Sequence, residues 1–141
     1  MIRIGDFVND FLNRGIELKL EVKAYDIDAA GHVNNIVYVR WLEDLRTELM
    51  KEIFDLRKVI EAGFYIVVTS TLVKYKREIK LFDRPIGKII LSGIGHGVLM
   101  LKASIEVSSR VCTIAEQQCV LMRLHDSTIL KEDELKDFMK L

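Results

Sequence analysis

Hydrophobic and polar residues alternate strictly over residues 16–23, and this pattern predicts a β-strand with one buried face. The apolar positions are taken by Ile16, Leu18, Leu20 and Val22, and charged residues stand between them. Because successive side chains of a strand point to opposite faces, a period of two places all these apolar residues on one side of a sheet.

The period becomes helical from Asn35 onward. An apolar stripe is formed by Tyr38, Trp41, Leu42, Leu45 and Leu49, and charged residues lie off this stripe. The spacing predicts a long amphipathic helix packed against a sheet, with Asn34 or Asn35 as its N-cap. A short second helix is predicted around Leu56–Glu61, ending near Gly63.

Most of the remaining chain has the composition of β-strands. Four strands are predicted, over Tyr65–Lys76, Ile86–Ser92, Leu99–Val107 and Val111–Leu124. Turn residues at 82–85, 93–97 and 108–109 separate them, and such short turns indicate an antiparallel meander.

Short helices are expected at both ends of the chain. One covers Ile4–Leu12 within an N-terminal extension (residues 1–15), and the other covers Glu132–Lys140 within the C-terminal segment (residues 127–141). The sequence as a whole predicts a single α+β domain over residues 1–141, in which a long helix packs on an antiparallel sheet.

Composition narrows the class of protein. The chain has 141 residues, half of them hydrophobic, with 21 Lys and Arg against 21 Asp and Glu. This length suffices for one core, and zero net charge argues against a nucleic-acid partner.

The start of the chain has no signal-peptide pattern, and no stretch reaches the ~20 apolar residues of a membrane helix. Cys112 and Cys119 lie an odd number of residues apart in one predicted strand, so they point to opposite faces and cannot pair. We therefore expect a reduced, cytoplasmic protein without a membrane partner.

Several motifs of catalysis and binding are missing from the sequence. It has no G-x-S-x-G elbow of a serine hydrolase. His32, His96 and His125 are far apart, and no Cys or His cluster has the spacing of metal ligands, so no metal site is predicted. Residues 93–97 lack the spacing of a phosphate-binding loop, and a glycine-rich hairpin or bulge is the better interpretation.

Residues 25–38, with the sequence YDIDAAGHVNNIVY, gather polar groups at the start of the long helix. The first N–H groups of a helix lack internal partners and lie at the positive end of its dipole, so they can polarise a carbonyl group. A carboxylate a few residues earlier can attack that carbonyl or take a proton from an attacking water. The alternative is a structural turn, because Asp, Gly and Asn are common turn formers.

This segment, continued as V-R-W-L-E, resembles the hotdog-fold thioesterases. It is most similar to the 4-hydroxybenzoyl-CoA thioesterase and acyl-CoA thioesterase group, and its H-V-N-N stretch is similar to the acyl-ACP thioesterases. The resemblance extends from Ile16 to about His125, since a strand, a long helix and four strands follow each other in the hotdog order as well. A second match, YKREIKLFD at residues 75–83, is similar to a tyrosine- and arginine-bearing strand of the family, which usually has proline where Glu78 stands.

The resemblance implies roles for individual residues. Asp28 matches the catalytic carboxylate, the backbone N–H of Asn35 would polarise the thioester carbonyl, and His32 would orient water or substrate. Asp26 is expected to be a structural neighbour. The acyl-ACP branch has asparagine where Ala30 stands, which favours the simpler mechanism based on Asp28 as nucleophile or general base. Glu43 matches a glutamate frequent in the acyl-CoA group, the alternative being an exposed ion pair with Arg40 or Arg46.

The expected substrate contacts come from the helix and the second match. Tyr38, Tyr75, Lys76 and Arg77 are assigned to substrate binding, although the helical spacing of Tyr38 and Trp41 also suits core residues. The basic residues are Lys74, Lys76, Arg77, Lys80 and Arg84. They form either a solvated strand face or a contact with the phosphates of coenzyme A or phosphopantetheine.

The resemblance therefore implies an acyl-CoA thioesterase that needs no metal and no cofactor. The alternatives are an acyl-ACP thioesterase, an acyl-thioester hydratase or dehydratase, and a non-catalytic acyl-thioester-binding protein. The hydratase pattern D-x-x-x-x-H is matched poorly, because only three residues separate Asp28 from His32. Edge-to-edge pairing of such sheets implies a homodimer or homotetramer.

Overall fold

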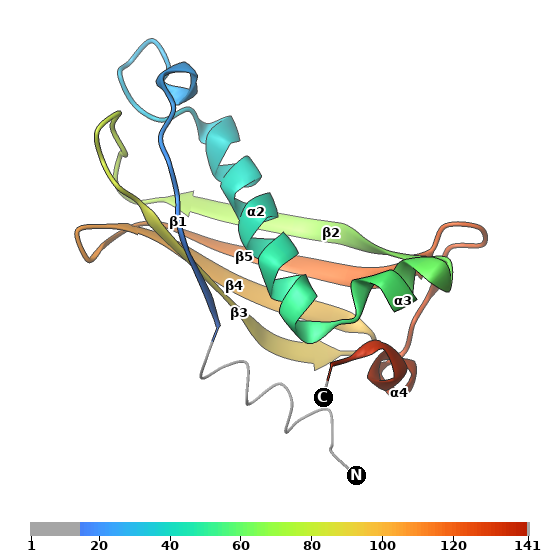
Figure 1. The fold of residues 1–141 in the computed structure, drawn as a ribbon. Coiled ribbons are helices and arrows are strands. Elements are labelled where there is room, and N and C mark those ends of the chain that lie inside the picture. Colours follow the sequence, from blue (N-terminus) through green and yellow to red (C-terminus); the bar gives the residue numbers. More distant parts are fainter. Residues whose placement is uncertain (1–14, 141) are drawn as a thin grey trace.

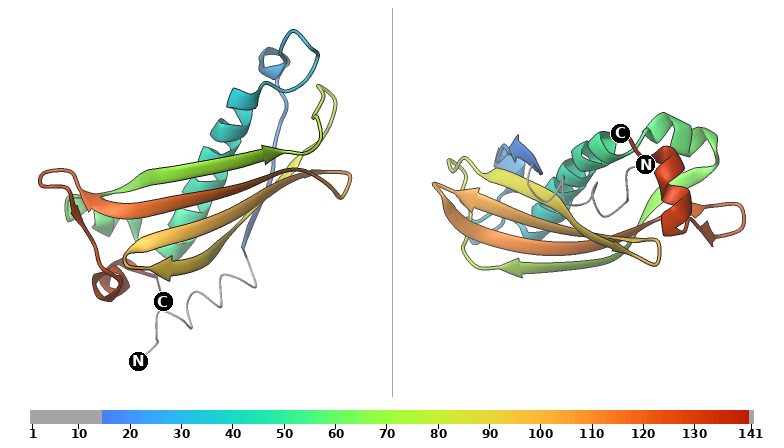
Figure 2. Two further views of the ribbon diagram at one scale, coloured as in Figure 1. Left: turned by 180° about the vertical axis from the view of Figure 1, so that it is seen from behind. Right: turned by 90° about the horizontal axis from the view of Figure 1, so that it is seen from below.

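A long helix lying across one face of an antiparallel sheet is the main feature of the computed structural model, which describes residues 15–140. The helix is α2 (Asn35–Ile53), and the sheet curves around it (Figures 1 and 2). Among the described residues, no helix covers the opposite face of the sheet. The strands are β1 (Ile16–Lys19), β2 (Phe64–Tyr75), β3 (Ile86–Gly95), β4 (Val98–Val107), β5 (Arg110–Arg123) and β6 (Thr128–Ile129). The shorter helices are η1 (Ala24–Asp26), α3 (Leu56–Glu61), α4 (Glu132–Leu135) and η2 (Lys136–Phe138).

Helix α2 forms where the sequence predicts it. The Asn34 side-chain oxygen accepts a hydrogen bond from the Ile36 N–H (3.1 Å), so Asn34 is the N-cap. The predicted apolar stripe is buried against the sheet. Gly87 of β3 permits this close packing, because a Cβ at that position would lie 2.8 Å from a methyl group of Leu45.

The strand order is β1-β3-β4-β5-β2, with β6 paired to β5. The predicted meander is correct for β3, β4 and β5, but it is wrong for β2, which pairs with β5 and not with β3. Segment 76–85 carries the chain from β2 at one edge of the sheet to β3, the neighbour of the edge strand β1 on the other side. It passes the N-terminal end of α2, where the Val33 N–H donates to the Ile79 carbonyl (2.8 Å) and the Ile79 side chain is completely buried. Burial of this one apolar residue anchors the crossover.

Tight turns join the strands of the meander. Ser108 and Ser109 both have positive φ (51° and 65°), the backbone that two-residue hairpins with a right-handed twist require. The glycine-rich stretch is a hairpin as predicted, with the β3 strand extending through Gly95 and a register shift between Leu91 and Gly93.

The structure corrects the bounds of two predicted elements and adds one short strand. Strand β1 ends at Lys19, opposite Ile86 of β3. The next N–H, that of Leu20, still donates to the Pro85 carbonyl (2.9 Å), but Pro85 has no N–H to donate, so the ladder stops there. The expected helix over residues 132–140 is interrupted after Leu135, because the Phe138 carbonyl accepts from the Asp55 N–H (2.8 Å) and the Lys140 N–H donates to the Ile53 carbonyl (2.8 Å). The two-residue strand β6 was not predicted, and the expected helix over residues 4–12 lies outside the described residues.

Two apolar clusters fill the space between α2 and the sheet. The larger one surrounds the C-terminal half of α2, and the smaller one surrounds Tyr38 and Trp41 near its start. Cys112 and Cys119 are buried and unpaired, as their spacing predicts. Within residues 15–140, no helix is long and apolar enough to cross a membrane.

Candidate active site at the start of the long helix

The loop that precedes α2 holds the Asp28 carboxylate in a defined orientation. Its Oδ1 accepts hydrogen bonds from the N–H groups of Ala30 (2.9 Å) and His32 (3.3 Å). A backbone bridge between Ile27 and Val33 closes the loop, and Gly31 adopts the positive φ of 85° that glycine tolerates without strain. Among the described residues, Oδ2 of Asp28 has no hydrogen-bond donor, so one oxygen is fixed and the other is available for chemistry.

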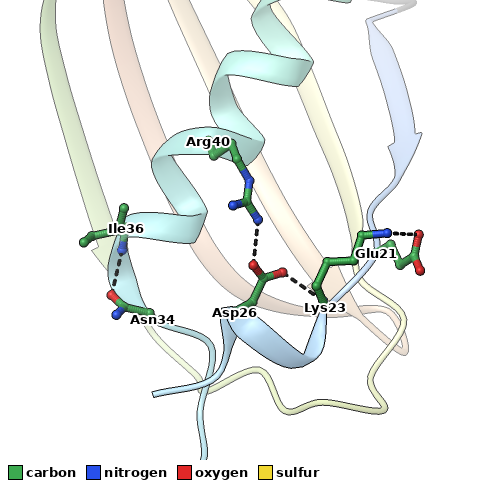
Figure 3. A network of polar contacts seen from close by, with 6 residues as sticks. All are labelled: Glu21, Lys23, Asp26, Asn34, Ile36 and Arg40. Atoms are coloured by element: carbon green, nitrogen blue, oxygen red, sulfur yellow. Dashed lines mark hydrogen bonds and ion pairs between the residues drawn. The ribbon is translucent and has the colours of Figure 1, made fainter. Parts of the chain in front are cut away.

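Asp26 has the structural role expected of it. Its side chain is 1% exposed and accepts from the Lys23 N–H and from the Arg40 guanidinium, both at 2.8 Å (Figure 3). Its carbonyl accepts from the Asn34 N–H (2.8 Å). The hydrogen bond to Asp26 raises the pKa of Arg40 above its ordinary value. Asp26 thereby fastens the loop to the first turns of α2.

The Asn35 N–H at the start of α2 remains free of protein acceptors. The Asn34 side chain takes the next N–H, that of Ile36, and within the described part of the chain no oxygen accepts from Asn35. The Asn35 carbonyl accepts from the Tyr75 hydroxyl (3.3 Å), which links α2 to the end of β2. An unpaired N–H at the positive end of a helix can polarise a bound carbonyl.

A cleft of about 350 Å³ brings most of the predicted site residues together. Its walls include seven residues that the sequence singled out, Asp28, His32, Asn35, Tyr38, Tyr75, Lys76 and Arg77. Val33 and Glu78 complete its lining. The loop before α2 contributes one wall and the start of segment 76–85 contributes the other, which explains why residues distant in sequence meet here.

The aromatic residues of the cleft are packed rigidly. Tyr38 contacts Tyr75 edge-to-face, with ring centroids 5.1 Å apart, and contacts Trp41 in the same way at 5.4 Å. Burial raises the pKa of Tyr38 to about 12. Tyr38 is therefore both a core residue and part of the cleft wall.

The residues of the basic stretch lie at different places in the structure. Lys76 and Arg77 line the cleft, and their N–H groups are fixed on the Cys112 carbonyl (2.8 and 2.9 Å). Lys74 lies on the outer face, in a separate hollow with Leu72 and Lys102. Only two of the predicted phosphate contacts therefore lie at the cleft.

Glu43 lies outside the cleft, farther along α2. Its carboxylate pairs with the Arg46 guanidinium, which is the alternative that the sequence left open. Arg46 is buried and donates to the Gln117 side chain (3.0 Å), which in turn donates to the Thr71 hydroxyl (3.1 Å). This network ties α2 to β5 and β2.

Sequence reasoning did not predict the partner of His32. Its Nε2 lies 2.8 Å from Oε2 of Glu78, across the two walls of the cleft. The one signal in the sequence was the glutamate at a position where the resembled family usually has proline.

We find weaker candidates for a functional site elsewhere in the described part of the chain. No group of three or more His, Cys, Asp or Glu residues in the described part of the chain is arranged to hold a metal ion. The larger hollow of about 560 Å³ between β1 and α2 is lined by charges of both signs. Two of its cations, Lys23 and Arg40, are held in ion pairs with Glu21 and Asp26.

Comparison with known proteins identifies the class. The sequence profile of the thioesterase-like superfamily matches residues 22–140, and the chain belongs to this superfamily. A search of curated proteins gives no match.

Solved structures show the same hotdog fold. A Thermus thermophilus thioesterase complexed with coenzyme A and Zn is similar with a TM-score of 0.73 and 22% identity, over 86% of this chain and 94% of that one. The DHNA-CoA thioesterase of Staphylococcus aureus gives a TM-score of 0.76 at 16% identity, over 84% and 81%. The probable thioesterase YbaW of Escherichia coli gives 0.74 at 20% identity, over 89% and 98%. The predicted hotdog fold is therefore confirmed.

Proposed function

We propose that the protein is an acyl-CoA thioesterase that hydrolyses an acyl-CoA to a carboxylic acid and free coenzyme A. Membership of the thioesterase-like superfamily supports thioester hydrolysis in general. The observation that carries the narrower proposal is the cleft, which joins the Asp28 carboxylate, the unpaired Asn35 N–H and two cations, Lys76 and Arg77.

The chemistry follows from these groups. The thioester carbonyl accepts a hydrogen bond from the Asn35 N–H, which stabilises the negative charge that develops on its oxygen. Asp28 Oδ2 then attacks the carbonyl carbon, and the C–S bond breaks to release the thiolate; alternatively, the same oxygen takes a proton from an attacking water. Anchoring of Oδ1 keeps the carboxylate oriented during either route.

Charge supports coenzyme A as the carrier of the acyl group. Lys76 and Arg77 suit its phosphates, and Tyr38 and Tyr75 flank the path toward the carbonyl. The coenzyme A complex of the Thermus relative adds support from a protein of the same fold. Acyl carrier protein carries the same thioester on phosphopantetheine, so both carriers belong in the assay.

We further propose a homodimer formed at the β2 edge. Strand β2 stands at the end of the strand order, and its long edge offers N–H and C=O groups to a second copy. A dimer of such dimers gives the tetramer.

Thiol release from acyl-CoA tests the function directly. We expect Asp28→Asn and Asp28→Ala to abolish it, because the variants lose the only carboxylate in the loop with a free oxygen, while circular dichroism stays native. The matched control is Asp126→Asn, which alters a carboxylate that also accepts from its own turn (Thr128 N–H, 3.0 Å) but lies outside the cleft. The buried cysteines should not interfere with a thiol reagent, because burial raises the pKa of Cys112 and that of Cys119, the latter to about 11.

Each alternative has its own outcome. Full activity in a folded Asp28→Ala variant would contradict the catalytic assignment. Tight binding of acyl-CoA without thiol release would indicate a non-catalytic binding protein. Loss of the absorbance of an enoyl thioester would indicate a hydratase. Thiol release from acyl-ACP but not from acyl-CoA would indicate an acyl-ACP thioesterase.

A further inference from the structure

A contact between the side chains of His32 and Glu78 joins the two walls of the cleft beside Asp28. The two side chains meet at 2.8 Å, and both line the same cleft as the Asp28 carboxylate. His32 also donates its backbone N–H to Asp28 Oδ1 (3.3 Å). The imidazole is therefore attached to the loop that presents the carboxylate.

The backbone around this pair is fixed on both sides. Before Glu78, the Arg77 N–H donates to the Cys112 carbonyl (2.9 Å). After it, the Ile79 carbonyl accepts from the N–H of Val33, the neighbour of His32 (2.8 Å), and Ile79 is completely buried. These bonds hold the backbone at residue 32 and the backbone at residue 78 opposite each other, within reach of the contact that the two side chains make.

A carboxylate at position 78 carries an electrostatic disadvantage for substrate binding. Glu78 directly follows Lys76 and Arg77, to which we assign the phosphates of coenzyme A, and a negative charge beside them repels an anion. Its contact with His32 gives the carboxylate a partner other than the phosphates. The geometry indicates that Glu78 acts on the imidazole and not on the substrate.

We propose that Glu78 is a positioning residue that holds His32 as the proton acceptor for the hydrolytic water, an inference that rests on the proposed thioesterase function. When Nε2–H of the neutral imidazole is donated to Glu78, the lone pair must reside on Nδ1. A carboxylate in this position also stabilises the imidazolium that forms when Nδ1 takes a proton.

The proton balance is simple. After Asp28 has displaced the thiolate, water attacks the acyl carbon and loses one proton to His32 Nδ1. The bond between the acyl carbon and Asp28 Oδ2 breaks, which restores the carboxylate and releases the acid. His32 then gives its proton to the coenzyme A thiolate, so that one water and one thioester become one carboxylic acid and one thiol.

Kinetics of Glu78→Gln, His32→Gln and the double variant test whether Glu78 acts through His32. We expect Glu78→Gln to lower kcat by about 10- to 100-fold without raising KM, since the charge it removes opposes phosphate binding. In the His32→Gln background the Glu78 change should have no further effect. The control is Glu61→Gln, which alters a comparably exposed glutamate (66%, against 63% for Glu78) that pairs with Arg57 (3.0 Å) outside the cleft.

Nuclear magnetic resonance of the imidazole nitrogens gives a readout that needs no activity. At about pH 8, His32 should show the Nε2–H tautomer in the native protein and lose this preference in Glu78→Gln. Additive kinetic effects, a raised KM or an Nδ1–H tautomer would overturn the proposal. If the native protein releases no thiol from any acyl thioester, the thioesterase function fails, whereas the tautomer still decides whether Glu78 orients His32.

Discussion

The two oxygens of the Asp28 carboxylate have different surroundings. Oδ1 is held by two backbone N–H groups of its own loop, and Oδ2 has no donor within residues 15–140. Acceptance of loop N–H groups, as by Oδ1, is common for an aspartate in a turn. An oxygen without a donor, such as Oδ2, is what a nucleophile needs. The structural turn and the reactive carboxylate, which the sequence presented as alternatives, are thus compatible in one residue.

Tyr38 gives a pH-dependent prediction at the same scale. Burial raises its pKa to about 12, above the ordinary value of 10 that applies in the unfolded chain. Between these values the unfolded state loses the phenolic proton and the folded state keeps it, so the free energy of unfolding should decrease as pH rises from about 10 toward 12. Below pH 10 this group should contribute no pH dependence.

Urea unfolding at a series of alkaline pH values measures this effect. Tyr38→Phe should remove part of the decline, whereas Tyr25→Phe, which alters a 78% exposed ring, should keep it. An identical decline in the Tyr38→Phe variant would contradict the assignment.

At the scale of elements, the close contact between α2 and β3 depends on the absence of a side chain at Gly87. A Cβ on Gly87 would lie 2.8 Å from one Leu45 methyl group and 3.1 Å from the other. We expect Gly87→Ala to lower the free energy of unfolding by about 1–3 kcal/mol, because the helix must shift or Leu45 must leave its rotamer.

Gly95 of the same strand is the matched control. A Cβ there would have no neighbour within 4 Å. Chemical denaturation should therefore show a much smaller change for Gly95→Ala than for Gly87→Ala, and equal changes would show that the close packing of α2 on β3 is not the cause.

The elements that the sequence predicts well are those that local periodicity defines. Helix α3 has the predicted bounds Leu56–Glu61, and α2 begins at the predicted Asn35. The position of β2 beside β5 could not be predicted, because periodicity describes which face of a strand is apolar and not which strand lies next to it.

The same limit applies to the candidate site. The loop residues Asp28, His32 and Asn35 stand together in sequence, whereas Glu78 reaches them only through the crossover that Ile79 anchors.

At the scale of the whole molecule, the exposed edge of β2 leads to a prediction about assembly. This strand of 12 residues pairs with β5 on one side, and no described residue pairs with its other side. We expect sedimentation velocity to show a dimer or tetramer at micromolar concentration, because a second copy satisfies the open N–H and C=O groups.

Hydrogen exchange locates the contact. The β2 amides that point away from β5 should be protected in the assembled protein and should exchange faster on dilution. A species that sediments as a monomer at all micromolar concentrations, or protection of β2 that does not depend on concentration, would contradict the edge-to-edge dimer.

The strand order also determines how the chain acquires its structure. Strands β3, β4 and β5 follow each other through tight turns, whereas β2 must find β5 and β1 must find β3 across long stretches of chain. Chains with many such distant pairings fold slowly, in about milliseconds to seconds. The cleft lies between the loop before α2 and residues 75–78 at the end of β2, so we expect it to be completed only after β2 has joined β5. Recovery of thiol release during refolding should therefore report the docking of β2, and partly folded species that contain only the central hairpins should release no thiol.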